Sequence, residues 1–136
     1  LCGLNAHAAQ SSLSERELLN EAIKDGYQTQ RNLAFFYQIG KSGIGGNEHI
    51  EKDEVKSCAW RKILLLSNPE KTDENDAINE RESCINLNQD QDWKVWRIVY
   101  HYIPLIDAQK AQGTYMVKKN EPVPKSELGI IEVDPQ

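Results

Sequence analysis

Two stretches of this chain carry residue types that could bind a phosphate or a metal, and each is incomplete. Gly40–Ser42 (Gly-Lys-Ser) resembles the end of a phosphate-binding loop, but that loop needs a glycine where Phe35 stands and a preceding strand. His49 lies among the acids of residues 47–54, yet zinc sites usually take His or Cys in pairs. Those acids are better explained as complements to the dipole of a following helix. We therefore predict no cofactor and no metal.

His101 lies between two tyrosines and is the other candidate for chemistry. A catalytic histidine needs a nucleophile and an acid that orients it, and the chain has no Gly-x-Ser-x-Gly or Cys-His signature. We interpret His101 as a packed or interfacial residue. The sequence thus predicts that the protein is not an enzyme.

The cysteines and the N-terminus together bear on the compartment. Leu1–Ala9 resemble the end of a signal peptide, with an Ala-x-Ala pattern that signal peptidase cleaves; the alternative is an N-terminus of arbitrary composition. Cleavage would remove Cys2 and leave Cys58 and Cys84, an even number that suggests a disulfide in an exported protein. The alternative is two free buried thiols. We predict a disulfide and a periplasmic or secreted location.

The composition is that of one globular domain. The chain has 136 residues, of which 39% are apolar and 27% charged. The net charge is −5, and no segment concentrates Lys and Arg, which argues against binding nucleic acid or an anionic membrane surface. No apolar run approaches the roughly 20 residues of a spanning helix, so we predict no membrane insertion.

Hydrophobic periodicity and helix-ending residues predict an all-α fold of about five helices. The first helix is expected to start near Ser12–Glu15 and to end at Asp25-Gly26. The other four are expected at about 27–39, 52–66, 73–88, with Thr72 or Asp73 as the cap of this one, and 91–111. Pro104 should kink or break the last of these helices. The chain from residue 114 onward contains most of the prolines, so we expect an extended tail there.

The most informative stretch is a helical hairpin. Asn32–Tyr37 (Asn-Leu-Ala-Phe-Phe-Tyr) is followed by a turn containing Gly40, Gly43, Gly45 and Gly46, and then by 56–63 with Ala-Trp at its middle. This arrangement resembles a Sel1-like repeat, a relative of the tetratricopeptide repeat. The resemblance implies helix–turn–helix packing and a surface that binds another protein. A second, degenerate repeat would follow it.

The resemblance also suggests an organisation and a role. Residues 1–9 would be the remnant of a signal peptide, 10–113 a Sel1-like helical repeat domain, and 114–136 a C-terminal tail. Small exported Sel1-like proteins often serve as adaptors or as immunity proteins for secreted toxins. We therefore expect a periplasmic protein–protein interaction module that binds a secreted effector. The alternative is a small cell-wall-active hydrolase of the cysteine-rich Sel1-like type.

We predict that Arg31, Phe35 and Gln38 bind the partner. Phe35 lies off the stripe that packs the second helix, and an aromatic residue beside an arginine is typical of interface hot spots. Exchanging Phe35 and Arg31 for alanine should then abolish binding without affecting folding. The alternative is that Phe35 packs against the first helix through Leu19 or Ile23.

Two further expectations concern the core. Trp93, Trp96 and Tyr100 recur at helical spacing and are expected to be core residues rather than a binding stripe, because a small domain needs large side chains to bury. Ala59 is expected where the two helices of the hairpin approach most closely, across from Phe36 or Tyr37.

Overall fold

The structure, a computed structural model, describes residues 15–41 and 49–116. Residues 15–25 are helical, and four helices follow: α2 (Tyr27–Ile39), α3 (Glu54–Ser67), α4 (Glu74–Cys84) and α5 (Gln89–Gln112). Within these two ranges the chain forms no strand, although Lys41 and Ile50 make an isolated antiparallel bridge. The expected all-α fold of about five helices is confirmed.

Side-chain caps fix where three of the helices begin. Asp53 accepts a hydrogen bond of 3.0 Å from a backbone N–H in the first turn of α3. Asp73, one of two predicted caps, forms a reciprocal capping box with Asp76 at the start of α4, and Asn88 does the same with Gln91 at the start of α5. Because Asn88 caps α5, α4 ends earlier than predicted.

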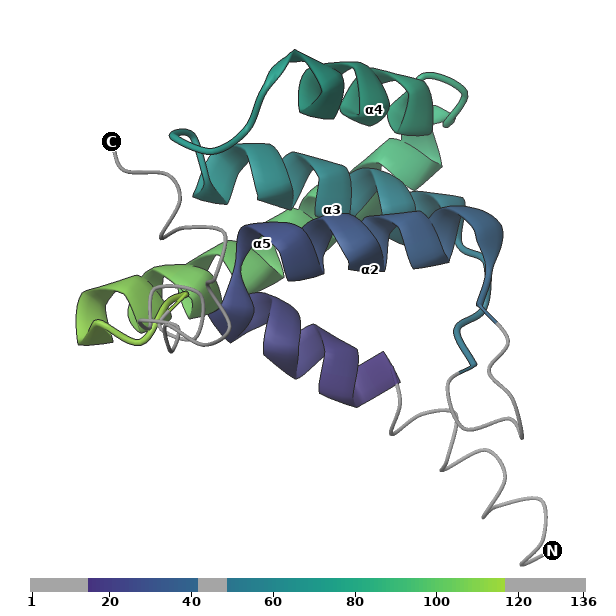
Figure 1. The fold of residues 1–136 in the computed structure, drawn as a ribbon. Coiled ribbons are helices and arrows are strands. Elements are labelled where there is room, and N and C mark those ends of the chain that lie inside the picture. Colours follow the sequence, from purple (N-terminus) through teal and green to yellow (C-terminus); the bar gives the residue numbers. More distant parts are fainter. Residues whose placement is uncertain (1–14, 42–48, 117–136) are drawn as a thin grey trace, which may run out of the picture.

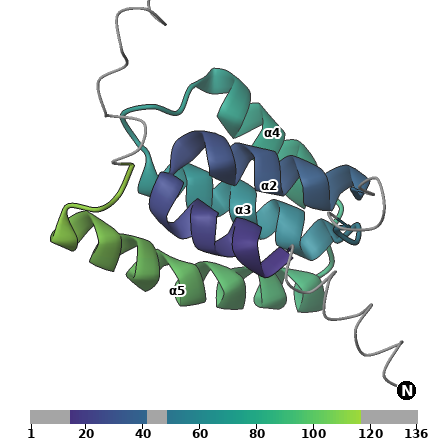
Figure 2. The same cartoon turned by 60° about the horizontal axis from the view of Figure 1, so that its bottom comes forward.

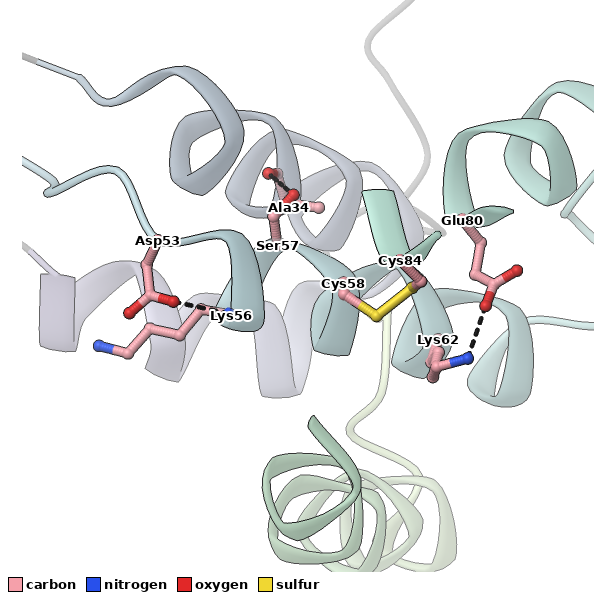
Figure 3. Close-up of a disulfide and its surroundings, with 8 residues drawn as sticks. All are labelled: Ala34, Asp53, Lys56, Ser57, Cys58, Lys62, Glu80 and Cys84. Atoms are coloured by element: carbon pink, nitrogen blue, oxygen red, sulfur yellow. Dashed lines mark hydrogen bonds and ion pairs between the residues drawn. A yellow bond between two sulfur atoms is a disulfide. The ribbon is translucent and has the colours of Figure 1, made fainter. Parts of the chain in front are cut away.

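Helix α3 is the centre of the fold. It contacts α2, α4 and α5, and Figures 1 and 2 show α4 and α5 on different sides of the α2–α3 pair. The hydroxyl of Ser57 in α3 donates a hydrogen bond of 2.9 Å to the carbonyl of Ala34 in α2 (Figure 3). Both residues are buried, so small side chains allow these two helices to lie close together.

The core is apolar and continuous. Ala59 is fully buried in it, and the ring of Trp60 packs against that of Tyr102 with centroids 4.8 Å apart. The buried members of the cluster are Ala22, Leu33, Ala34, Tyr37, Ile50, Cys58, Ala59, Trp60, Ile63, Val95, Val99 and Ile106. Apart from Ile50, which precedes α3, they come from all described helices except α4, which is attached to the core rather than part of it.

Helix α5 is continuous through Pro104, so the predicted break does not occur. Pro104 lies on the exposed side of the helix. The carbonyl of Tyr100, which the missing N–H leaves without its usual intrahelical donor, can therefore be hydrogen-bonded by water. On the other side, Val99 and Ile106 are buried and hold the two halves of the helix against the core.

The residues just after α5 turn back onto the helices. The N–H of Met116 donates a hydrogen bond of 2.7 Å to the carbonyl of Lys24. The hydroxyl of Tyr115 donates to Asn68 (2.6 Å) and accepts from Gln30 (3.0 Å), and the amide of Asn68 donates to Gln30 (2.8 Å). This closed polar network attaches the start of the predicted tail to α2 and to the end of α3.

Several predicted features lie outside the described residues. They are the signal-peptide remnant (1–9), the glycines Gly43, Gly45 and Gly46, and the tail beyond residue 116.

Candidate binding groove

Five polar or aromatic side chains on one face of α2 line a groove of about 380 Å³ that α3 and α4 complete. The three predicted binding residues, Arg31, Phe35 and Gln38, all lie in it. Arg61 from α3 and Asn79 from α4 contribute the other sides, and Gln28 and Asn32 complete the lining from α2. The spacing of the α2 residues, three or four apart along the chain, explains why they share one face.

An acidic side chain beside this groove connects α4 to α2. Asp76, in the first turn of α4, is 0% exposed. Its Oδ2 accepts hydrogen bonds from the hydroxyl of Tyr27 (2.7 Å) and from the N–H of Asp73 (3.1 Å). Its Oδ1 lies 3.2 Å from Nε of Arg31, an ion pair that lacks hydrogen-bond geometry. Burial and the bond to Asp76 raise the pKa of Tyr27.

Arg61 is the groove residue that the sequence analysis missed. Its side chain is only 5% exposed, and its Nε has no hydrogen-bond partner among the described residues. Burial and the positive charge of Arg31 lower the pKa of this guanidinium, and the charge of Asp76 opposes them. The sequence shows only an arginine within the largely apolar segment Cys58–Leu66, which does not indicate what packs against it.

Phe35 contributes an apolar surface to the groove. It is 47% exposed, and its ring lies 6.5 Å from that of Phe36. The alternative, in which Phe35 packs against Leu19 or Ile23 of the first helix, would bury more of this ring than the structure shows. The groove therefore combines two guanidinium groups, several amides and a partly exposed aromatic ring.

Two of the three aromatic residues of α5 that were expected in the core are exposed instead. Trp93 is 64% exposed and Tyr100 is 72% exposed, while Trp96 is partly buried beneath Nζ of Lys62, which lies 5.0 Å from its ring centroid. Helix α5 instead packs through its aliphatic face, which carries Val95 and Val99. Helix α5 carries both an aromatic and an aliphatic stripe at helical spacing, and the spacing alone does not show which of them packs against the core.

The disulfide joins α4 to the central helix (Figure 3). The structure places the sulfur atoms of Cys58 and Cys84 2.06 Å apart, as the predicted pairing requires. Nearby, Nζ of Lys62 donates a hydrogen bond of 2.6 Å to Glu80, so an ion pair reinforces the same contact. Together they hold α4, and with it Asp76, over the groove side of α3.

The other candidate residues have ordinary contacts. His49 pairs with the exposed Glu51 at 2.8 Å, and His101 packs edge-on against Tyr102. Nζ of Lys41 lies 4.4 Å from the ring centroid of Phe36, and a helix rather than a strand precedes Gly40. In residues 15–41 and 49–116, no group of three or more His, Cys, Asp or Glu could hold a metal ion.

No family model, curated protein or solved structure matches the chain. In the part of the chain that the structure describes, none of the helices combines the length and apolar character needed to cross a membrane.

Proposed function

We propose that the protein is a protein–protein interaction module and that the groove of α2, α3 and α4 binds its partner. The observation that carries the proposal is the grouping of Arg31, Phe35 and Gln38 with a second arginine in one groove. Arginine and aromatic residues are enriched where interfaces gain most of their binding free energy.

The proposal extends to the repeat type and the compartment. An all-α fold, with α2 packed on α3, is consistent with a Sel1-like, tetratricopeptide-like domain. A disulfide is typical of oxidising compartments and supports export to the periplasm. There the protein would act as an immunity protein or adaptor for a secreted effector, and its net charge of −5 would favour encounter with a basic effector.

Pull-down with matched variants tests this proposal. The bait is the full chain, used against periplasmic extract of the bacterium that encodes it. Phe35→Ala removes the exposed ring of the groove, and Trp93→Ala removes a more exposed ring on α5. We expect a protein that wild type and Trp93→Ala retain and Phe35→Ala loses. Equal capture by all three baits would rule out the groove as the binding surface.

A further inference from the structure

The groove holds a buried positive charge on Arg61 that the carboxylate of Asp76 offsets only in part. Arg61 is almost completely buried and lines the groove, but it makes no ion pair with a described residue. Arg31 and Arg61 are the two charged residues in the lining of the groove, and Arg31 pairs with the buried Asp76, so Arg61 is the arginine of this pair without an ion-pair partner among the described residues. Burying a guanidinium without a partner is unfavourable unless another group compensates it.

Asp76 cannot supply that compensation alone. One of its oxygens already accepts two hydrogen bonds, from Tyr27 and Asp73, and the other lies against Arg31. The planar fork of an arginine matches a carboxylate, and each such pair is charge-assisted. Since Arg61 lines the groove, a molecule bound there can bring an anion to it.

We propose that the groove binds a carboxylate of a peptide segment, with Arg61 as its principal contact and Phe35 against a neighbouring apolar side chain. This inference rests on the proposed function and specifies the partner's chemistry. Because one of the two lining arginines is already paired with Asp76, a singly charged carboxylate is a closer match for the other than a doubly charged phosphate. The amides of Gln28, Asn32 and Gln38 both donate and accept hydrogen bonds, as a peptide backbone requires and a bare anion does not.

Titration of the full chain with short peptides tests the ligand. The probe is N-acetyl-Phe-Glu-amide, and the readout is the NMR resonance of the Arg61 Nε–Hε group in 15N-labelled protein. We expect a saturable shift with this peptide and at least about tenfold weaker binding of N-acetyl-Phe-Gln-amide, which lacks the charge. N-acetylphenylalanine, with its free carboxylate, tests whether a chain terminus is the preferred source.

Substitution of Arg61 provides the second arm. Arg61→Met keeps the length of the side chain and removes its charge, and Arg97→Met makes the same change at an exposed position of α5. Followed at the Phe35 backbone amide, peptide binding should weaken at least about tenfold in Arg61→Met and stay unchanged in Arg97→Met. The melting temperature of Arg61→Met should not fall, because the variant loses an uncompensated buried charge.

Three outcomes of the titration would overturn the inference. The first is an equal shift of the Arg61 resonance with the Glu and Gln peptides. The second is a shift with sodium sulfate, at matched ionic strength, that equals the shift with the Glu peptide. The third is no shift with any probe, as expected if acids of the chain itself occupy the groove. If Arg61→Met failed to fold, the wild-type titration would still decide. A partner that Arg61→Met captures as well as wild type would refute the carboxylate contact and leave the proposed function intact.

Discussion

The hydroxyl of Tyr27 donates a hydrogen bond of 2.7 Å to Asp76, and this contact joins the first residue of α2 to the first turn of α4. The same carboxylate caps its own helix and pairs with Arg31. Helix α4 has few apolar residues. Asp76 is the only residue of this helix that is fully buried. Its position therefore depends on this acid and on the disulfide rather than on a hydrophobic face.

Asp76→Ala should reduce the free energy of unfolding by about 3 kcal/mol. The variant loses a helix cap and leaves Arg31 and Arg61 without the nearest negative charge. Glu82→Ala, at an exposed position of the same helix, should change stability by less than about 0.5 kcal/mol. Urea denaturation monitored by circular dichroism measures both. Equal losses would show that Asp76 acts only through helix propensity.

Cys58 and Cys84 should be bonded in the purified protein. Thiol titration under denaturing, non-reducing conditions should find neither of them free, and Cys84→Ala should lower the free energy of unfolding by about 3.5 kcal/mol, as loop entropy predicts for a separation of 26 residues. Reduction of wild type should produce a similar loss. If a reducing agent left the urea midpoint unchanged, the bond would contribute nothing to the fold.

Glu15 should make part of the stability depend on pH. Burial tends to raise the pKa of its carboxyl, but hydrogen bonds from Tyr37 and Lys56, and the charge of Lys56, lower it below the ordinary 4.5. A carboxyl whose pKa is lower in the folded state contributes stability above its unfolded pKa. That contribution disappears as the pH falls through the folded pKa.

The measurement compares wild type with Glu15→Gln in urea at neutral pH and at about pH 2, well below the ordinary carboxyl range. Wild type should be more stable at neutral pH, and the difference should shrink in acid. Glu17→Gln, at an exposed position, should differ little from wild type at either pH. An equal difference at both pH values would mean that the carboxylate charge of Glu15 contributes no stability.

The sequence predicted those features that short-range signals determine. Helix α2 has the predicted bounds because Gly26 and Gly40, both with positive φ, lie on either side of it. The cysteine pair was predicted from the two cysteines that remain if Cys2 is removed with the expected signal peptide. The exposed position of Phe35 followed from its place off the packing stripe, which is a property of α2 alone.

The sequence could not reveal features that depend on how helices meet. Arg61 resembles a surface residue, and it is buried because the disulfide and Asp76 hold α4 beside it. The stripe of Trp93 and Tyr100 looks like a core face, but the aliphatic stripe of α5 faces α3 instead. In both cases the decisive information is the packing partner, which local periodicity does not contain.

Ala59→Leu should destabilise the fold by about 1–3 kcal/mol, because Ala59 is fully buried in a closely packed core and a larger side chain must displace its neighbours. The matched control is Ala77→Leu in α4, where the alanine is exposed. Chemical denaturation of both variants makes the comparison. An unchanged midpoint for Ala59→Leu would contradict the packing of α3.

The last prediction separates the two residues that we expected to act together in binding. Phe35→Ala should leave the melting temperature nearly unchanged, because the ring is 47% exposed. Arg31→Ala should lower it, since Nε of Arg31 lies 3.2 Å from the buried carboxylate of Asp76, which would lose its ion-pair partner. The expectation that both changes spare the fold is therefore revised for Arg31, and a binding defect in that variant could reflect lost stability.

Differential scanning calorimetry of the two single variants makes this comparison. Gln38→Ala, which changes an exposed residue of the same groove, serves as the control and should match wild type. A melting temperature lowered by many degrees in Phe35→Ala would show that this ring belongs to the core. The binding surface would then have to be sought elsewhere, first on the exposed aromatic residues of α5.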